Sequence, residues 1–185
     1  MRLLLLPNFE RHKFLPRVYF SNSHMTSNDV LKNLTEYNVW ANTRVLKSMD
    51  RIGGDLPDYA QLMFSHVLNA QAIWIARITG TKSPVTVLQR HTLEELHRLH
   101  EQTSPKLVEL YANADEAELN RTIEYTNTQG KAYSTKVQDI LTHAINHATY
   151  HRGQVARELR PTGHEPINSD YVTYVRIQYG QDLEI

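Results

Sequence analysis

Apolar residues recur every three or four positions along four stretches of the chain, which is the spacing that lines one face of an α-helix. The stretches cover residues 27–49, 57–79, 92–114 and 136–160. Glycine or proline follows the first, second and fourth of them, where these residues commonly end a helix. Four helices with short connections are typical of an antiparallel bundle, because each helix must bury its apolar face against the others.

The periodicity changes before the fourth helix. Residues 122–126 and 131–134 flank the turn-forming segment Asn127-Thr-Gln-Gly130, a pattern typical of a β-hairpin. Beyond the fourth helix, apolar residues between 171 and 177 predict a short helix that docks on the others. The whole pattern predicts an all-α fold, an antiparallel four-helix bundle with a small β-hairpin before the fourth helix. The crossover that bears the hairpin leaves the order of the helices open.

Local signals refine the helix boundaries. Thr92 and Glu95 match a capping box at the start of the third helix, and Thr135 and Gln138 match another at the start of the fourth. Pro105 lies inside the third stretch. It is expected to kink or restart that helix, because proline has no backbone N–H to donate.

Length and local composition favour one domain. At 185 residues the chain is long enough for one domain with a sizeable core and short for two. Residues 1–24 differ from the rest, because an apolar run too short to span a membrane is followed by basic residues. We expect residues 25–185 to form a single domain. Residues 1–24 are expected to be a disordered extension or a segment upstream of a true start at Met25, with a mitochondrial-type leader as the alternative.

Charge and residue types narrow the function. The chain has 20 lysines and arginines and 20 aspartates and glutamates, so its formal net charge is zero. Without a basic patch we expect no nucleic-acid partner, and without a long apolar run we expect no membrane association. The chain has no cysteine, so a metal site must use nitrogen and oxygen ligands, and the absence fits a cytoplasmic protein. Ten histidines are many for this length.

Three of these histidines, His143, His147 and His151, recur every four residues on the fourth helix. A four-residue step advances only ~40° around a helix, so neighbours in the series share a face and can bind one ion. On a helical wheel His151 lies ~60° and His147 ~100° from the centre of the apolar stripe, whereas His143 lies ~140° away. We therefore expect His147 and His151 to line the buried face and His143 to lean toward solvent.

A helical pair supplies two ligands, and a metal site needs at least a third from elsewhere. His66 is the strongest candidate, because it lies within the apolar stripe of the second helix, where an imidazole must find a hydrogen-bond partner or a metal. For a lone histidine, a hydrogen bond within the core is the more common arrangement. The inward-facing pair on another helix favours a metal site formed by His66, His147 and His151.

A second group of histidines and carboxylates lies on the third helix and comprises His91, Glu94, Glu95, His97, His100 and Glu101. Glu94-x-x-His97 resembles half of a di-iron carboxylate site, which needs a second such motif on another helix. The chain has no second Glu-x-x-His. We therefore expect this group to form the solvated face of the third helix, with some histidine–carboxylate pairs.

The fourth helix also carries a recognisable motif. Its segment His143-Ala-Ile-Asn-His-Ala-Thr-Tyr-His-Arg-Gly-Gln154 resembles the H-x-x-x-H-x-x-x-H-R-G-Q signature of the DinB family. Three further segments agree with that family: Tyr37-Asn-Val-Trp-Ala-Asn42, His66 with Trp74, and Pro166 followed by Ser169-Asp170-Tyr171. The resemblance covers about residues 25–178. It implies a four-helix bundle, frequent homodimers and a metal held by His66, His147 and His151.

The resemblance also suggests a reaction. Some members of the family transfer low-molecular-weight thiols such as bacillithiol, and others are mycothiol-dependent isomerases. It therefore implies a divalent metal cofactor, a small thiol as a second cofactor and a small-molecule substrate. Imidazole ligation suits zinc, nickel, iron and copper alike, so the identity of the metal (zinc, nickel or iron) stays open. Three neutral imidazoles leave the charge of an ion uncompensated and a coordination position open, which is typical of a catalytic site. The expected activity is metal-dependent transfer of a thiol to a small electrophile, with a hydrolase as the related possibility.

Several motif residues have expected roles near this site. Arg152 is a candidate for holding an anionic cofactor or substrate, with a salt bridge as the alternative. Gln154 is expected to hydrogen-bond a ligand histidine, and Gly153 is expected to let another helix pack closely. The first helix offers Tyr37, Trp40 and Asn42 as candidates to line the pocket, although for Trp40 the core is the favoured place.

Two interpretations compete with an enzyme. A non-catalytic metal-binding bundle, such as a stress-response protein, explains the same motifs without a reaction. An ordinary structural bundle with incidental histidines is the third interpretation. The three differ in whether the histidines bind an ion and whether a bound ion supports turnover.

Overall fold

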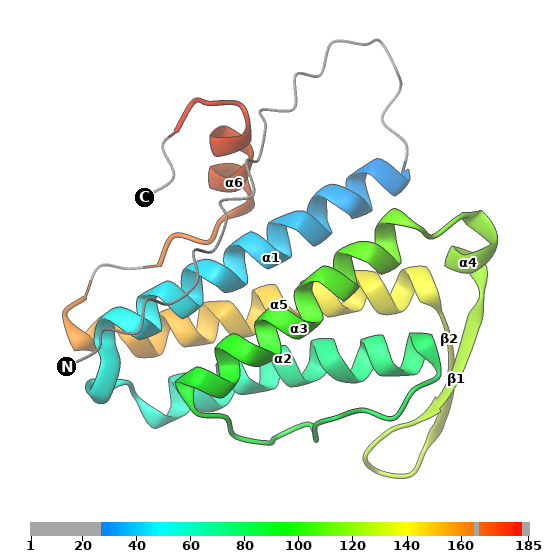
Figure 1. Ribbon diagram of the computed structural model, residues 1–185, viewed down its shortest axis with the longest axis horizontal. Helices are drawn as coiled ribbons and strands as arrows, with labels where there is room; N and C mark the ends of the chain where they lie inside the picture. The colour runs from blue at the N-terminus through cyan, green and yellow to red at the C-terminus, as the bar shows by residue number, and fades with distance from the viewer. Residues whose placement is uncertain (1–26, 165–166, 183–185) are drawn as a thin grey trace, which may run out of the picture.

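A computed structural model of the protein describes residues 27–164 and 167–182 (Figure 1). The predicted extension of residues 1–24 lies outside these ranges, as does Pro166 of the C-terminal motif.

The described residues form a mainly helical fold with one two-stranded antiparallel sheet, as the sequence predicts. The long helices are α1 (Ser27–Ile52), α2 (Asp58–Thr79), α3 (Leu93–Ala112) and α5 (Val137–Leu159). Shorter elements are η1 (Gly53–Asp55), α4 (Glu116–Asn120), η2 (Arg160–Thr162) and α6 (Tyr171–Gln178). The hairpin consists of β1 (Thr122–Thr126) and β2 (Ala132–Lys136), in which Tyr125 pairs with Tyr133.

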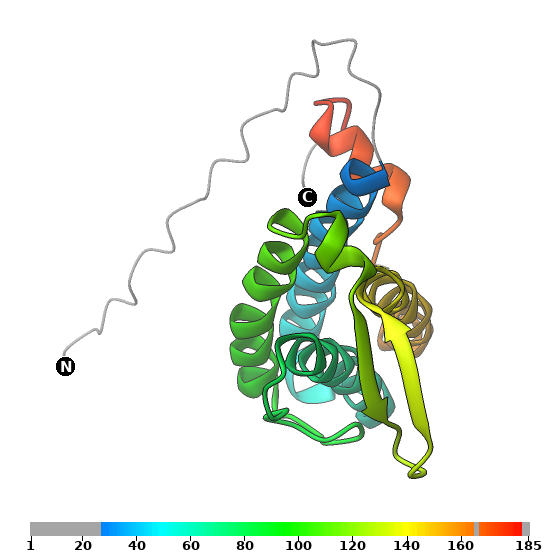
Figure 2. The same cartoon turned by 90° about the vertical axis from the view of Figure 1, so that its right-hand side faces the viewer.

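The four long helices lie side by side (Figures 1 and 2). Helix α2 packs against α3 and α5, and helix α1 packs against the same two helices, so α1 and α2 are diagonal neighbours. Residues 80–92, which we call the strap, run back along α2 before α3 begins (Figure 1). Because of this return, α2 and α3 run in the same direction, whereas α2 and α5 run in opposite directions (Figure 1). The hairpin stands at the end where α3 leads into α5 (Figure 2).

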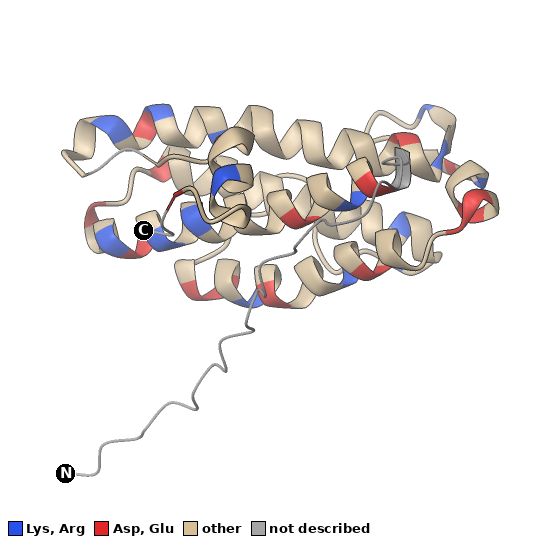
Figure 3. Ribbon diagram, turned by 90° about the horizontal axis from the view of Figure 1, so that it is seen from above, with Lys and Arg blue, Asp and Glu red and all other residues tan. Residues whose placement is uncertain are grey.

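Two groups of buried apolar side chains hold these helices together. One includes Leu46, Phe64, Leu68, Leu96 and Val155, and the other, nearer the hairpin, includes Leu107, Ile123, Val137, Ile140 and Leu141. Charged residues of both signs are interspersed along the helices (Figure 3). None of the helices within the described residues combines the length and the apolar character needed to cross a membrane.

The local structure confirms one capping prediction and corrects others. Thr92 accepts a hydrogen bond from the backbone N–H of Glu95 and completes the predicted capping box of α3. The predicted box at Thr135 is wrong: Thr135 lies in β2, α5 begins at Val137, and its N-cap has no side-chain hydrogen bond. A restart at Pro105 is also wrong, since α3 continues through this residue. Pro105 is exposed, so water can bond the carbonyl group that the ring leaves unpaired.

Candidate metal centre

The three histidines predicted to bind a metal come together between α2 and α5. One nitrogen from each ring of His66, His147 and His151 lies within 4.8 Å of the others. The ring centroids are 4.4 to 4.8 Å apart, and all three side chains are partly buried. This is the one group of three or more possible metal-binding side chains that the described part of the chain contains. It forms because α2 packs against α5, which places His66 beside the turn of α5 that carries His147 and His151.

Hydrogen bonds fix the proton on two of these rings. Nδ1 of His66 lies 3.0 Å from the carbonyl oxygen of Val87, and Nδ1 of His151 lies 2.8 Å from Oε1 of Gln154. Both partners are carbonyl-type oxygens, which only accept, so each Nδ1 carries the proton and donates it. The other nitrogen of each neutral ring, Nε2, then has a free lone pair, which is the state a metal ligand requires. The predicted hydrogen bond between Gln154 and a histidine of the cluster is confirmed.

His147 differs from the other two histidines. Its Nε2 lies 3.1 Å from Nε2 of His66, and its Nδ1 is buried without a partner among the described residues. Among these residues, no hydrogen bond on Nδ1 therefore orients this ring, in contrast to His66 and His151. Burial, reinforced by the neighbouring histidines His151, His66 and His143, lowers the pKa of His147 from 6.5 to about 4. Burial also lowers the pKa of His151. Both effects favour the neutral imidazole that binds metals.

The separation of two of the ring nitrogens fits a shared ion. Two imidazole nitrogens bound to one ion at about 2.1 Å, at angles between octahedral and tetrahedral, lie about 2.9 to 3.4 Å apart. The two Nε2 atoms of His66 and His147 are 3.1 Å apart. A set of three neutral nitrogens suits zinc, nickel, iron and copper alike, so the donor atoms fit a divalent ion without selecting one.

The strap supplies the carbonyl group that orients His66. Asn69 anchors the strap to α2, because its Nδ2 lies 2.7 Å from the carbonyl oxygen of Gln89 and 3.4 Å from that of Val87. The ring of His91 donates to Oδ1 of Asn69 at 2.7 Å, and Gln61 donates to the carbonyl oxygen of His91 at 2.8 Å. These buried contacts hold Val87 beside His66. The amino-acid sequence does not reveal this contact, since a backbone carbonyl group leaves no motif.

His143 lies next to the cluster but outside it. Its side chain is exposed, as predicted, and its ring centroid is 5.4 Å from that of His147. Trp74 stands edge-on to His143 at 5.5 Å and edge-on to Tyr125 of the hairpin at 5.1 Å. Arg77 lies over the rings of both Trp74 and Tyr125, at 4.5 and 4.4 Å. This contact attaches the hairpin to α2 beside the histidine cluster.

The other motif residues lie elsewhere. Arg152 is 1% exposed and hydrogen-bonds Asn42 and Tyr37 of α1, so these three form a contact inside the protein. A ligand-binding role for Arg152 stays a prediction that this buried position does not support. Trp40 packs with Tyr37 in an apolar group near α6, as expected for a core residue. The predicted role of Gly153 is wrong, because it is exposed and a Cβ added there would meet nothing within 4 Å.

The histidines and carboxylates expected on the third helix do not form a shared site, and His91 lies in the strap just before α3. His97 lies 2.9 Å from Asp50, a histidine–carboxylate pair of the kind expected, whereas Glu94 lies 3.9 Å from Arg98. The expectation that these residues form a solvated face is wrong for His91 and His100, whose side chains are buried at 7% and 9% exposure. Each is buried because it has hydrogen-bond partners on a neighbouring helix, Asn69 for His91 and Thr43 for His100.

Comparison with known proteins places the chain among its relatives. The sequence profile of the DinB family matches residues 25–183. The chain is also similar to Protein DinB of Bacillus subtilis (strain 168), with 27% identity over 165 residues that cover 80% of this chain and 94% of the relative. The family match spans the helices that carry the three clustered histidines. By its match along most of its length, the chain belongs to the DinB family.

Proposed function

We propose that the protein binds one divalent metal ion through His66, His147 and His151. The observation that carries this proposal is the pair of carbonyl-type acceptors on Nδ1 of His66 and of His151. Oxygen acceptors at this position orient the ring and raise the basicity of the nitrogen that faces a metal. One buried histidine often has such a partner, but here two rings have one on Nδ1 while their other nitrogens lie in the same cluster, as a shared ion requires.

Different residues of the chain would have different roles in such a site. The three imidazoles hold the ion, the Val87 carbonyl group and Gln154 orient two of them, and burial keeps His147 neutral. When bound, a divalent ion supplies positive charge that lowers the pKa of a thiol or water molecule in its open position. Tyr150 is exposed and stands edge-on to His151 at 5.0 Å, so its ring lies on the solvent side of the cluster.

We further propose that the site transfers a low-molecular-weight thiol to a small electrophile. The chain has no cysteine, so the thiol has to come from a soluble cofactor. In the reaction the thiol sulfur forms a bond to a carbon atom of the electrophile, and the thiol proton leaves with the displaced group. Family membership supports a reaction of this class, and the neutral ligand set supports it because an anionic nucleophile would balance the charge of the ion.

Elemental analysis of protein purified without a polyhistidine tag tests metal binding. We expect about one ion per chain in the wild-type protein. His147→Ala and His66→Ala should lose the ion, because each removes a ligand. His143→Ala is the matched control, since it removes an exposed histidine one turn away and should retain the ion. Loss of the ion in His143→Ala but not in His151→Ala would contradict the assignment of the ligands.

Turnover assays test the reaction separately. Metal-loaded wild-type protein, metal-free protein and His66→Ala are each incubated with a panel of small thiols and a chromogenic electrophile. We expect conjugation only with the loaded wild-type protein. Equal rates for loaded and metal-free protein across the panel would refute thiol transfer, and a protein that binds metal without turnover would be the non-catalytic stress-response type.

Other features belong to the same proposal. We propose that α1, α2, α3 and α5 form the four-helix bundle typical of the family, since each packs against two of the others. A homodimer, a cytoplasmic location and a small-molecule substrate rather than a nucleic acid are proposed with it. The zero formal net charge supports a small-molecule substrate over a nucleic acid.

A further inference from the structure

Arg152 is a buried cation whose partners are all neutral. Its Nη1 donates to Oδ1 of Asn38 at 2.6 Å and to Oδ1 of Asn42 at 2.9 Å. Its Nη2 donates to Oγ1 of Thr149 at 2.8 Å and to the hydroxyl group of Tyr37 at 3.3 Å. Among the described residues no carboxylate lies within ion-pair distance of it. A buried charge without a counterion is costly, so these neutral groups have to stabilise it.

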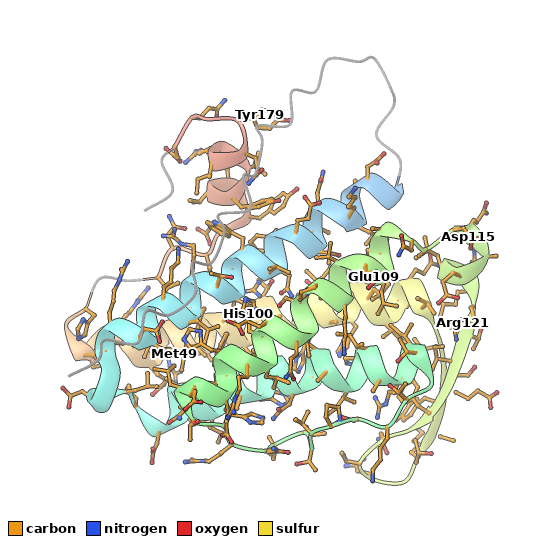
Figure 4. The ribbon with its side chains drawn as sticks, in the orientation of Figure 1. Met49, His100, Glu109, Asp115, Arg121 and Tyr179 are labelled. Carbon is orange, nitrogen blue, oxygen red and sulfur yellow. The ribbon has the colours of Figure 1, made fainter. Side chains whose placement is uncertain are left out.

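The stabilising groups extend across all four long helices. Asn38 of α1 donates to Oε1 of Gln71 on α2 at 3.2 Å, and Gln71 donates to Oγ of Ser104 on α3 at 3.4 Å. Ser104 lies 2.9 Å from Nδ1 of His100, whose Nε2 lies 2.9 Å from Oγ1 of Thr43. Figure 4 labels His100 on α3, among the long helices. We call this chain of side chains, from Arg152 to Thr43, the relay.

The direction of each hydrogen bond in the relay can be assigned. The hydroxyl group of Thr43 donates to the carbonyl oxygen of Val39 at 2.9 Å, so its oxygen accepts from Nε2–H of His100. Nδ1 of neutral His100 then accepts from Ser104, which in turn accepts from Gln71. Every group therefore has its accepting atom toward Arg152 and its donor away from it. Aligned dipoles of this kind reinforce one another and act as the counterion of the buried guanidinium group.

The cation also lies beside a proposed metal ligand. Arg152 follows His151 on α5, and two of its bonds reach Asn38 and Asn42 on α1, one turn apart. These bonds restrict rotation of α5 about its axis. A ring nitrogen lies roughly 6 to 7 Å from the helix axis, so a rotation of about 10° would move it by ~1 Å. A displacement of that size is enough to weaken a metal site.

The same cation contacts the C-terminal segment. Tyr37 accepts from Arg152 and donates to the carbonyl oxygen of Ser169 at 2.8 Å, just before α6. The guanidinium carbon also lies 5.3 Å from the centre of the Tyr37 ring. Arg152 thus connects α5, α1 and the segment that leads into α6. Lysine cannot make these contacts, because its single ammonium group lacks the planar fork of donors that reaches four oxygens at once.

We infer that Arg152 is a positioning residue for the metal centre, which it holds in register by fixing α5 through the relay so that His151 and His147 face His66. This inference rests on the proposed metal site. It assigns to Arg152 a role inside the protein in place of direct contact with an anionic ligand.

The test uses cobalt(II) alone as the probe, because its visible absorption spectrum reports ligand geometry. Wild-type protein, Arg152→Gln and Arg152→Lys are titrated with cobalt(II), and their thermal unfolding is recorded. We expect both variants to bind cobalt(II) at least about ten-fold more weakly and to show an altered spectrum, with lysine failing to rescue the site. Leu107→Ala is the matched control: it removes a buried side chain near the hairpin, and it should lower the melting temperature without changing the spectrum.

Milder variants keep the test valid if Arg152 variants fail to fold. Thr149→Val removes one acceptor of Arg152 with little change in shape, and we expect a two- to three-fold loss of cobalt(II) affinity. Asn38→Asp keeps an acceptor oxygen and should retain the wild-type spectrum, whereas Asn38→Leu should alter it. An unchanged spectrum and affinity in folded Arg152→Gln, or in Thr149→Val and Asn38→Leu together, overturns the inference. Failure of wild-type protein to bind cobalt(II) overturns the proposed metal site and this inference with it.

Discussion

Acidification from pH 7 to pH 5 is expected to destabilise the protein through His100. This side chain is 9% exposed, and burial, with a smaller effect of the nearby His97, lowers its pKa from 6.5 to about 4. The unfolded chain therefore binds a proton at pH 5 that the folded protein does not, and stability is lost as the pH falls from the unfolded pKa toward the folded one. The two pKa values correspond to a loss of about 2 kcal/mol between pH 7 and pH 5 from this residue alone.

The assay isolates His100 by a double difference. The free energy of unfolding is measured in urea at both pH values for metal-free wild-type protein and for His100→Gln. Other titrating groups contribute equally to both proteins and cancel, so the variant should lose about 2 kcal/mol less than the wild type. His100→Asn serves as a control, since it also lacks the titrating ring but places its amide differently. Equal pH dependence in wild type and both variants would show that the buried imidazole does not titrate as described.

Three further outcomes are expected. Thr92→Ala removes the capping box of α3 and should lower the free energy of unfolding by about 1 kcal/mol, whereas Thr92→Ser should restore it. Arg77→Gln removes a cation that lies over two aromatic rings and donates to the Thr126 carbonyl group, so hydrogen exchange should accelerate in β1 and β2 while the helices stay protected. Metal affinity should fall on acidification, but at lower pH than for free imidazole, because burial lowers the pKa of His147 and His151; equal occupancy at pH 7 and pH 4.5 would point to carboxylate ligands.

The histidine cluster could be anticipated because its pattern is helical. The four-residue spacing places His147 and His151 on one face, and the wheel separates both from His143, which the structure leaves exposed. The partner of His66 could not be anticipated. The Val87 carbonyl group is brought to Nδ1 by a strap whose path depends on Asn69 of α2, and a single sequence shows neither that path nor a backbone acceptor.

The two errors in the group of histidines expected on the third helix share a cause. A helical wheel places polar residues on the solvent side, because it contains no information about hydrogen-bond partners on neighbouring helices. His91 and His100 can be buried because Asn69 of α2 and Thr43 of α1 hydrogen-bond them. These contacts depend on how the helices are placed against one another. The boundary between β2 and α5 also depends on tertiary contacts. Local capping preference placed the start of the helix at Thr135, but pairing with β1 keeps β2 extended as far as Lys136.

Arg152 illustrates how such buried polar groups determine the register of the helices. If α5 slipped by one turn, Arg152 would move by about 5.4 Å and leave its oxygen partners on α1. A buried cation without partners costs several kcal/mol, whereas apolar side chains such as Val155 and Leu159 exchange neighbours at much lower cost. The apolar faces therefore bring the helices together, and the relay selects the one register among the alternatives. In that register His147 and His151 lie opposite His66, so the same bonds that stabilise the guanidinium group also determine whether three histidines can meet.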